Sequence, residues 1–373
     1  LSATQIGVLK TTQIAAISTA DIASMSNADL QVFSATQLGA LTATQIGSLT
    51  TTQIAALTTT QITSLTSAGV GGLKDTQIAA FDTTQIAALS TTLIAALSTT
   101  SVKALTVTQI GSLTITQLGA LTNTELGAFT EDQIAALSTT QIAALSTAQI
   151  SALPVDGVDN LSIADISVLS TDQIAAFAPA QIAAFTTTQM ATFTTQQLAA
   201  LTATQMGAIL DTQIAALSAT SLASLKTSQL AALSTAGING ITTTQLGALA
   251  TSQIVNLTVT QIGNLSATQF DALSTTQLAA LRTTQISAIS TTDIASISNT
   301  DLLAFSATQL AVLTSAQTGA LTTSQAAALT ATQLGALSVT AVKGFKDTQI
   351  AAMTSTQLAA LSTTQLVALS STA

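Results

Sequence analysis

Large apolar residues recur every eight residues along the whole chain. Steps of eight from Leu1 to Leu369 meet 47 positions, and every one of them is Leu, Ile, Phe or Met. With these residues numbered as position 1 of an octad, a second ladder lies at position 6. It is large and apolar in 44 of 46 octads, the exceptions being Thr318 and Ala326, which predicts weak packing over residues 314–329. No insertion or deletion breaks the register, so the pattern predicts one structural element per octad.

The residues between the two ladders predict a short helix. Position 2 is Ser or Thr in 37 of 47 octads, and position 5 is Gln in 33 of the 46 complete octads. This S/T-x-x-Q spacing is that of a capping box, in which the hydroxyl and the Gln side chain cap the first turn of a helix. Ala-Ala-Leu then continues the helix well, and residues three apart, such as Ile6 and Leu9, share one face. We therefore predict an all-α solenoid of very short helices, one in each octad.

Two other folds are open to such a pattern. In one unbroken helix, eight residues turn through about 800°, so the ladders would wind around the axis and face no single core. A β-solenoid with two octads, 16 residues, in each coil is the stronger alternative, because Thr and Ile favour strands. However, the apolar spacing alternates between five and three, whereas a half-buried strand alternates every two residues. The all-α solenoid is therefore the favoured prediction.

The polar positions carry two further expectations. Charged residues never occupy positions 1, 6 or 8, so we expect the remaining positions, including those of the Gln and acidic residues, to face water. Where a basic residue stands at position 2, the following Thr or Asp is expected as an alternative cap. These basic residues are Lys10, Lys74, Lys226, Arg282 and Lys346.

The repeat overrides the domain count that the length would suggest, because a solenoid is one quasi-linear body. We expect residues 1–373 to form a single continuous solenoid, as a segment of a longer chain. Residues 1–100 and 273–372 are related copies, offset by 34 octads. Phe33, Phe81, Phe129 and Phe177 recur every 48 residues, which fits two or three octads per coil.

Composition narrows the classes of function. The chain has no Cys, His, Trp or Tyr, only 6% charged residues and a net charge of −9. The sequence has no basic patch with aromatic residues, so we expect no nucleic-acid partner. Mean hydropathy is +0.58, yet polar residues interrupt every octad, so no membrane span is expected. The acids are scattered, so we expect no enzyme, and no catalytic, cofactor-binding or metal-binding residues.

Two minor motifs suggest sites. The segment PVDGVDN holds Asp156, Asp159 and Asn160, whose oxygens could bind calcium, although a calcium site needs about six to eight oxygen ligands. We favour the interpretation that this segment forms a local bend. Asn160, Asn256 and Asn264 begin N-L-S or N-L-T sequences that match glycosylation sequons, which chance produces readily in so Ser- and Thr-rich a chain.

The runs TTQIAALS and STTQLAAL resemble the octad arrays of very large, repetitive, adhesin-like bacterial surface proteins. This resemblance implies an extracellular structural protein that forms a rod, filament or adhesin stalk. Copies of itself, joined end to end or side by side, and matrix polysaccharide are then the expected partners. The alternative function is a surface-binding solenoid that presents rows of Thr, Ser and Gln to ice or polysaccharide.

Overall fold

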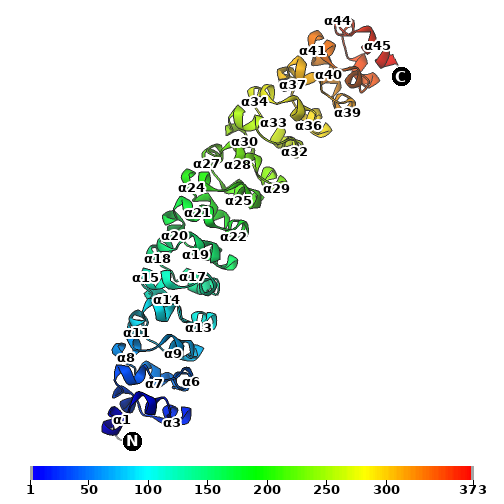
Figure 1. The fold of residues 1–373 in the computed structure, drawn as a ribbon. Coiled ribbons are helices and arrows are strands. Elements are labelled where there is room, and N and C mark those ends of the chain that lie inside the picture. The colour runs from blue at the N-terminus through cyan, green and yellow to red at the C-terminus, as the bar shows by residue number, and fades with distance from the viewer. Residues whose placement is uncertain (1–2, 371–373) are drawn as a thin grey trace. The chain divides into compact units, whose positions relative to one another are not determined.

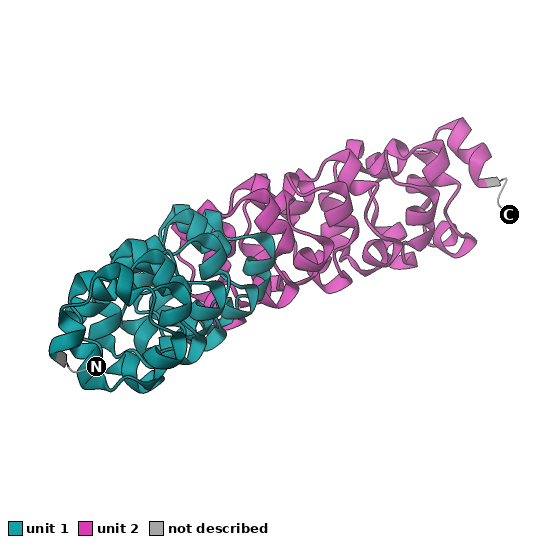
Figure 2. Ribbon diagram, turned by 60° about the horizontal axis from the view of Figure 1, so that its bottom comes forward, with its two compact units in different colours: residues 1–185 teal, residues 186–373 magenta. Residues whose placement is uncertain are grey.

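The computed structural model describes residues 3–370, and in this range every octad forms one short helix. No β-strand occurs among the described residues. The prediction of an all-α solenoid with one helix per octad is therefore confirmed, and the β-solenoid alternative is wrong. The chain divides into two compact units, Leu1–Phe185 and Thr186–Ala373, which are coloured separately in Figure 2.

Unit 1 contains 22 α-helices and one 3₁₀ helix, η1, among its described residues. They are α1 (Ala3–Gly7), α2 (Thr11–Ile14), α3 (Thr19–Ser24), α4 (Asn27–Gln31), α5 (Ala35–Leu38), α6 (Ala43–Ile46), α7 (Thr51–Ala55), α8 (Thr59–Thr63), α9 (Ser67–Gly71), α10 (Asp75–Ile78), α11 (Thr83–Ala88), α12 (Thr91–Ile94), α13 (Thr99–Ala104), α14 (Val107–Ser112), α15 (Ile115–Ala120), α16 (Asn123–Leu126), α17 (Glu131–Ala135), α18 (Thr139–Ala144), α19 (Thr147–Ala152), η1 (Val155–Asn160), α20 (Ile163–Val168), α21 (Thr171–Ala176) and α22 (Pro179–Ala184).

Unit 2 continues the same series of short helices within its own described residues. They are α23 (Thr187–Ala191), α24 (Thr195–Ala200), α25 (Ala203–Ala208), α26 (Asp211–Ala216), α27 (Ala219–Ala223), α28 (Thr227–Ala231), α29 (Thr235–Asn239), α30 (Thr243–Ala248), α31 (Thr251–Val255), α32 (Val259–Gly263), α33 (Ala267–Asp271), α34 (Thr275–Ala280), α35 (Thr283–Ile286), α36 (Thr291–Ser296), α37 (Asn299–Ala304), α38 (Ala307–Leu310), α39 (Ser315–Ala320), α40 (Thr323–Ala328), α41 (Ala331–Ala336), α42 (Val339–Val342), α43 (Asp347–Ala351), α44 (Ser355–Ala359) and α45 (Thr363–Ser370).

Most octads begin and end their helix in the same way, as α18 illustrates. Ser138 is the N-cap in an extended conformation, and its hydroxyl accepts the Gln141 N–H at 3.3 Å. At the other end, the Leu145 N–H donates to the Ile142 carbonyl at 3.2 Å, and Leu145 itself is extended. Two consecutive extended residues, at positions 1 and 2, thus turn the chain into the next octad. No described residue has a positive φ, so the corners do not depend on glycine.

Octads with a basic residue at position 2 keep the same helix start. Lys10 remains the N-cap, Thr11 is already the first helical residue, and the Lys10 side chain makes no capping bond. Instead, the Gln13 N–H donates to the Lys10 carbonyl oxygen at 2.9 Å. The expectation that the following Thr or Asp would become the cap is therefore wrong, because the octad register fixes the corner whatever side chain stands there.

Within each unit, helices pack against the helix three octads away, as α10 does on α13 and α33 on α36. One coil therefore takes three octads, and the successive coils are visible in Figure 1. The 48-residue spacing of the Phe residues now has an explanation. Phe33, Phe81, Phe129 and Phe177 lie within three residues after the ends of α4, α10, α16 and α21. These helices belong to one stack of unit 1, so a Phe recurs on every second coil of that stack.

The two ladders fill the core of each unit. Away from the first and last coils, position 6 side chains are almost fully buried and position 1 side chains are nearly so, as Ile142 at 0% and Leu145 at 4% exposure show. Thr318 and Ala326 are also buried in the second ladder. The related copies, residues 1–100 and 273–372, lie in different units. That the two units form one continuous solenoid stays a prediction.

Candidate functional site: a buried glutamine ladder

The Gln side chains at position 5 are buried. From Gln37 onward every Gln at this position is between 0 and 8% exposed, whereas Gln5 and Gln13 in the first coil are exposed. The expectation that these residues face water is therefore wrong. Their capping role is confirmed, but it uses only part of the side chain.

Gln141 shows how the whole carboxamide is used. Its Oε1 accepts the Ser138 backbone N–H at 2.7 Å, which completes the capping box of its own helix. Its Nε2 donates to the carbonyl oxygens of Ile110, at 3.0 Å, and Leu113, at 2.8 Å, on the previous coil. The same bonds, to residues 31 and 28 positions earlier, recur in unit 2, for example at Gln277. We call this column of side chains the glutamine ladder.

Gln suits this position for a chemical reason. The slot needs one acceptor for the cap and two hydrogens for the carbonyls of the neighbouring coil, and a carboxamide supplies both. A carboxylate of equal length supplies only acceptors when ionised. Each slot thereby joins two coils through buried hydrogen bonds in which every donor and acceptor of the carboxamide has a partner. Buried polar networks that are satisfied in this way favour a single arrangement of the elements that they join. The sequence held a signal for this role, because a cap alone would accept Glu as well, yet Glu stands at position 5 only once.

Three acids occupy buried slots of the ladder, contrary to the expectation that all acids face water. They are Glu125, Asp165 and Asp293, at 5, 6 and 2% exposure. In Asp165, Oδ2 accepts from the Ser162 N–H at 2.9 Å and from its hydroxyl at 2.6 Å, as Gln Oε1 would accept from the N-cap. The other oxygen, Oδ1, is buried without a partner, and so is Oδ2 of Asp293. Burial raises the pKa of Asp293 above its ordinary value.

Exposed acids at helix starts behave in the opposite way. The Ser26 hydroxyl and backbone N–H donate to Asp29 and lower the pKa of that carboxyl. The Gln85 backbone N–H, at 2.7 Å, and the Thr84 hydroxyl donate to Asp82 and lower its pKa in the same way. These two acids are therefore caps that work best when ionised.

The segment PVDGVDN forms η1 and leaves a slot of the ladder empty. Gly157 stands at the Gln position, and a Cβ there would lie 2.8 Å from Ile134, so the glycine permits a close approach to α17. Pro154, at the N-cap, has no N–H, so the donor that a Gln Oε1 would accept is missing as well. By the register of the ladder, the carbonyls that no Gln side chain reaches here are those of Leu126 and Phe129, of which Leu126 still accepts the Phe129 backbone N–H at 3.1 Å.

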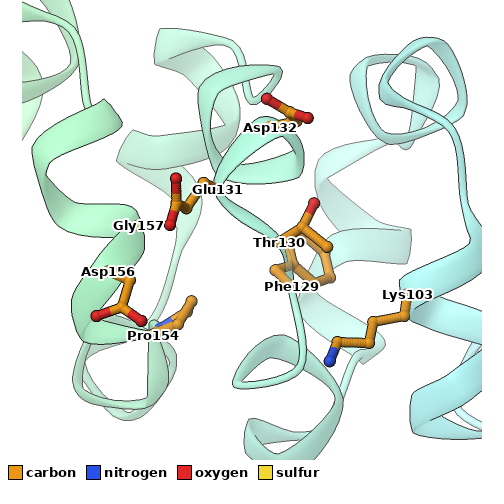
Figure 3. A pocket seen from close by; sticks show the side chains of 8 residues that line it. All are labelled: Lys103, Phe129, Thr130, Glu131, Asp132, Pro154, Asp156 and Gly157. Atoms are coloured by element: carbon orange, nitrogen blue, oxygen red, sulfur yellow. The ribbon is translucent and has the colours of Figure 1, made fainter.

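A hollow of about 370 Å³ lies at this empty slot. Its lining includes Phe129, Pro154, Gly157, three carboxylates and one ammonium group, and Figure 3 shows Lys103 across the hollow from Asp156. The charged residues are Lys103, Glu131, Asp132 and Asp156, and all four are exposed. None of them is desolvated in the manner of a general acid or base.

The remaining candidate residues are occupied by local hydrogen bonds. The Asn160 amide donates to the Asp159 carboxylate at 2.9 Å and to the Asp156 carbonyl at 3.3 Å. Asn256 and Asn264 donate to the carbonyl four residues earlier, at 2.7 Å each, and all three Asn are exposed. Over residues 3–370, no group of three or more acids could hold a metal ion. In the same range, no helix is long and apolar enough to cross a membrane.

Comparison with known families agrees with this architecture. The sequence matches the ALTTAQ repeat over residues 14–51, 78–123, 126–163, 222–259, 294–331 and 331–363, together more than half of the chain. The chain belongs to the ALTTAQ repeat family. In this chain the corresponding run, such as Ala56 to Gln61, extends from position 8 of one octad through the corner and cap to the Gln of the next. No curated protein and no solved structure matches the sequence.

Proposed function

We propose that this ALTTAQ-repeat protein is a non-catalytic structural scaffold, an extracellular rod, filament or adhesin stalk. The observation that carries the proposal is the glutamine ladder. Because nearly every coil is joined to the next by the same bonds, adding octads lengthens the structure without requiring new chemistry. The hydroxyl-rich, sparsely charged surface supports association with further copies or with polysaccharide outside the cell.

The burial of Gln weakens the alternative function. A surface that binds ice or polysaccharide through rows of Thr, Ser and Gln would need the Gln amides of position 5 exposed, and from Gln37 onward they are not. Rows of Ser and Thr remain available for such contacts. We place this binding function second.

Small-angle scattering tests the scaffold role. The full chain should be compared with a variant that lacks the six octads from Ser90 to Leu137, which are two whole coils. For an extended scaffold, the largest dimension falls in proportion to the residues removed. A dimension that falls only as the cube root of length, as in a globule, would contradict the proposal.

Location and assembly need separate measurements. An antibody raised against the chain should label intact cells of the organism that makes it, and protease added outside should remove the label. Concentration-dependent sedimentation should reveal self-association. Labelling only after the cells are broken would refute the extracellular part of the proposal, while leaving the scaffold role to the scattering result.

A further inference from the structure

Asp293 stands in a slot of the glutamine ladder. It is the fifth residue of its octad, on α36, and is 2% exposed. Its backbone N–H donates to the Ser290 hydroxyl at 3.0 Å, so α36 is capped like its neighbours. The side chain differs, because its Oδ2 is buried and has no hydrogen-bond partner.

The carbonyls that a Gln would bind are available on the previous coil. On the next coil, Gln317 donates its Nε2 to Ile286 at 2.9 Å and to Ile289 at 2.8 Å. The same register, counted back from Asp293, gives the carbonyls of Ile262 and Leu265. An ionised carboxylate has no hydrogen to offer them. The Ile262 carbonyl still accepts the Leu265 N–H at 3.3 Å, but no side-chain donor enters the slot and Oδ2 of Asp293 stays without a partner, which disfavours the charged form.

The charged groups on the elements around Asp293 do not compensate for its charge. Asp271, on α33, accepts a bond from the Ser296 hydroxyl of α36 at 3.3 Å and adds a second negative charge. Helices α32, α34 and α39 carry no titratable side chain. Among the adjoining octads, Asp301 lies on α37, and Arg282, at the N-cap of α35, donates to the Leu257 carbonyl.

We propose that Asp293 is a proton-operated clasp between α36 and the coil that carries α32 and α33. With a proton taken from solvent, the carboxylic acid regains part of what the carboxamide supplies: one oxygen accepts, and the single O–H of this side chain, one methylene shorter than Gln, donates to one carbonyl of the previous coil. When the proton leaves, the donor is lost and the contact loosens. Mild acid therefore tightens this junction, while junctions made by Gln do not respond to pH.

The direction of the pH effect follows from linkage. Burial first, and the charge of Asp271 to a smaller extent, raise the folded-state pKa of Asp293 above 3.8, while bonds to Ser290 oppose the rise. Between 3.8 and that raised value, the folded chain binds more protons than the unfolded chain. The contribution of Asp293 to stability is thus largest below pH 3.8, falls as the pH rises through this window, and is constant above it.

Hydrogen exchange on the full chain tests the clasp. Protection of residues 290–297 and 262–271 should be measured in mild acid and at neutral pH, with correction for the intrinsic exchange rate. We expect at least about threefold greater protection in acid for the natural chain. The variant Asp293→Gln should show equal protection at both pH values. The control Asp301→Gln changes the acid at the same position of the next octad and should keep the difference.

Two outcomes would overturn the clasp: equal protection of the natural chain at both pH values, or a difference that persists in Asp293→Gln. Infrared spectroscopy of the natural chain gives a readout that needs no variant. A carboxylic-acid band should persist above the pH at which the exposed acids have ionised. If every carboxyl ionises together with the exposed acids, the clasp does not exist, whether or not the variant folds.

Discussion

Gln141 Nε2 donates to the carbonyl oxygen of Ile110, 31 residues earlier, across 3.0 Å. This bond joins two coils, whereas the bond from the Ser138 N–H to Gln141 Oε1 belongs to one helix. A single side chain thus starts its own helix and fixes that helix to the coil before it. The coupling explains how helices that mostly have only four to six residues, far too short to be stable alone, persist in an ordered stack.

The first prediction concerns this coupling. We expect Gln141→Ala to lower the free energy of unfolding by about 1–3 kcal/mol, because it leaves the Ser138 N–H and the Leu113 carbonyl without partners. Gln141→Glu keeps the length and the acceptor but removes the donor, so at neutral pH it should also destabilise. The control is Thr140→Ala, at the exposed neighbouring residue, which should change the free energy of unfolding little. Urea unfolding followed by circular dichroism measures all three, and equal stability of Gln141→Ala and the control would contradict the role of the ladder.

The sequence predicted the helices better than it predicted their assembly. Spacing along the chain suffices to identify a cap such as Ser138 and a ladder such as Ile142 and Leu145, because both are local. Burial of Gln141 depends on Ile110, and that proximity follows only once three octads make a coil. The 48-residue spacing of the Phe residues is compatible with either two or three octads per coil. The partnerless oxygens of Asp165 and Asp293 could not be foreseen for the same reason.

The second prediction concerns Asp82, whose pKa is lowered by the Gln85 N–H and the Thr84 hydroxyl. Because the folded pKa lies below 3.8, the unfolded chain binds more protons in the window beneath that value. The stability that the ionised cap contributes is therefore complete above pH 3.8 and is lost as the pH falls through the folded pKa. We expect the difference in melting temperature between the natural chain and Asp82→Ser to be constant near neutral pH and to change only in acid. A difference that changes near neutral pH would contradict this assignment.

The third prediction refines the weak stretch expected at residues 314–329. Thr318 compensates for its small size, since its hydroxyl donates to the Ala341 carbonyl at 2.6 Å and Gly344 lets the coils approach closely. Ala326 has no side-chain hydrogen bond that could replace the missing apolar contact. Its carbonyl does not accept the Leu329 N–H, although the equivalent bond from Leu337 to Leu334 forms at 3.2 Å.

We therefore expect hydrogen exchange of amides inside unit 2, away from its ends, to be fastest at residues 323–329, with Thr318 better protected. Mass spectrometry of peptide fragments from the labelled full chain resolves the two octads. Faster exchange around Thr318 than around Ala326 would show that the hydroxyl does not replace the lost apolar contact.

The fourth prediction is that calcium does not affect stability. Asp156 and Asp159 lie on η1, but the Asn160 amide occupies one oxygen of Asp159, and two exposed carboxylates fall far short of the ligands that calcium needs. Thermal melts with calcium and with a chelator should coincide. A large upward shift with calcium that Asp156→Asn abolishes would prove the site.

The last prediction is that the octad is the unit of insertion and deletion. Removal of the 48 residues from Ser90 to Leu137 takes out two whole coils and keeps the register. Gln141 would then lie opposite the carbonyls of Ile62 and Leu65, the equivalents of those that it binds now. We expect a folded, shorter chain with unchanged helical content per residue, measured by circular dichroism.

Deletion of only Ala143 to Ser146 is the matched comparison. It shifts Gln149 by half an octad against the carbonyl of Leu118, which it now binds at 3.0 Å, and it moves both apolar ladders out of line with the previous coil. The damage should extend over every coil that must pack across the shift, because a large side chain that fails to enter the core forfeits about 1.5–3 kcal/mol. If the four-residue deletion melted at the same temperature as the 48-residue deletion, the octad would not be the structural unit.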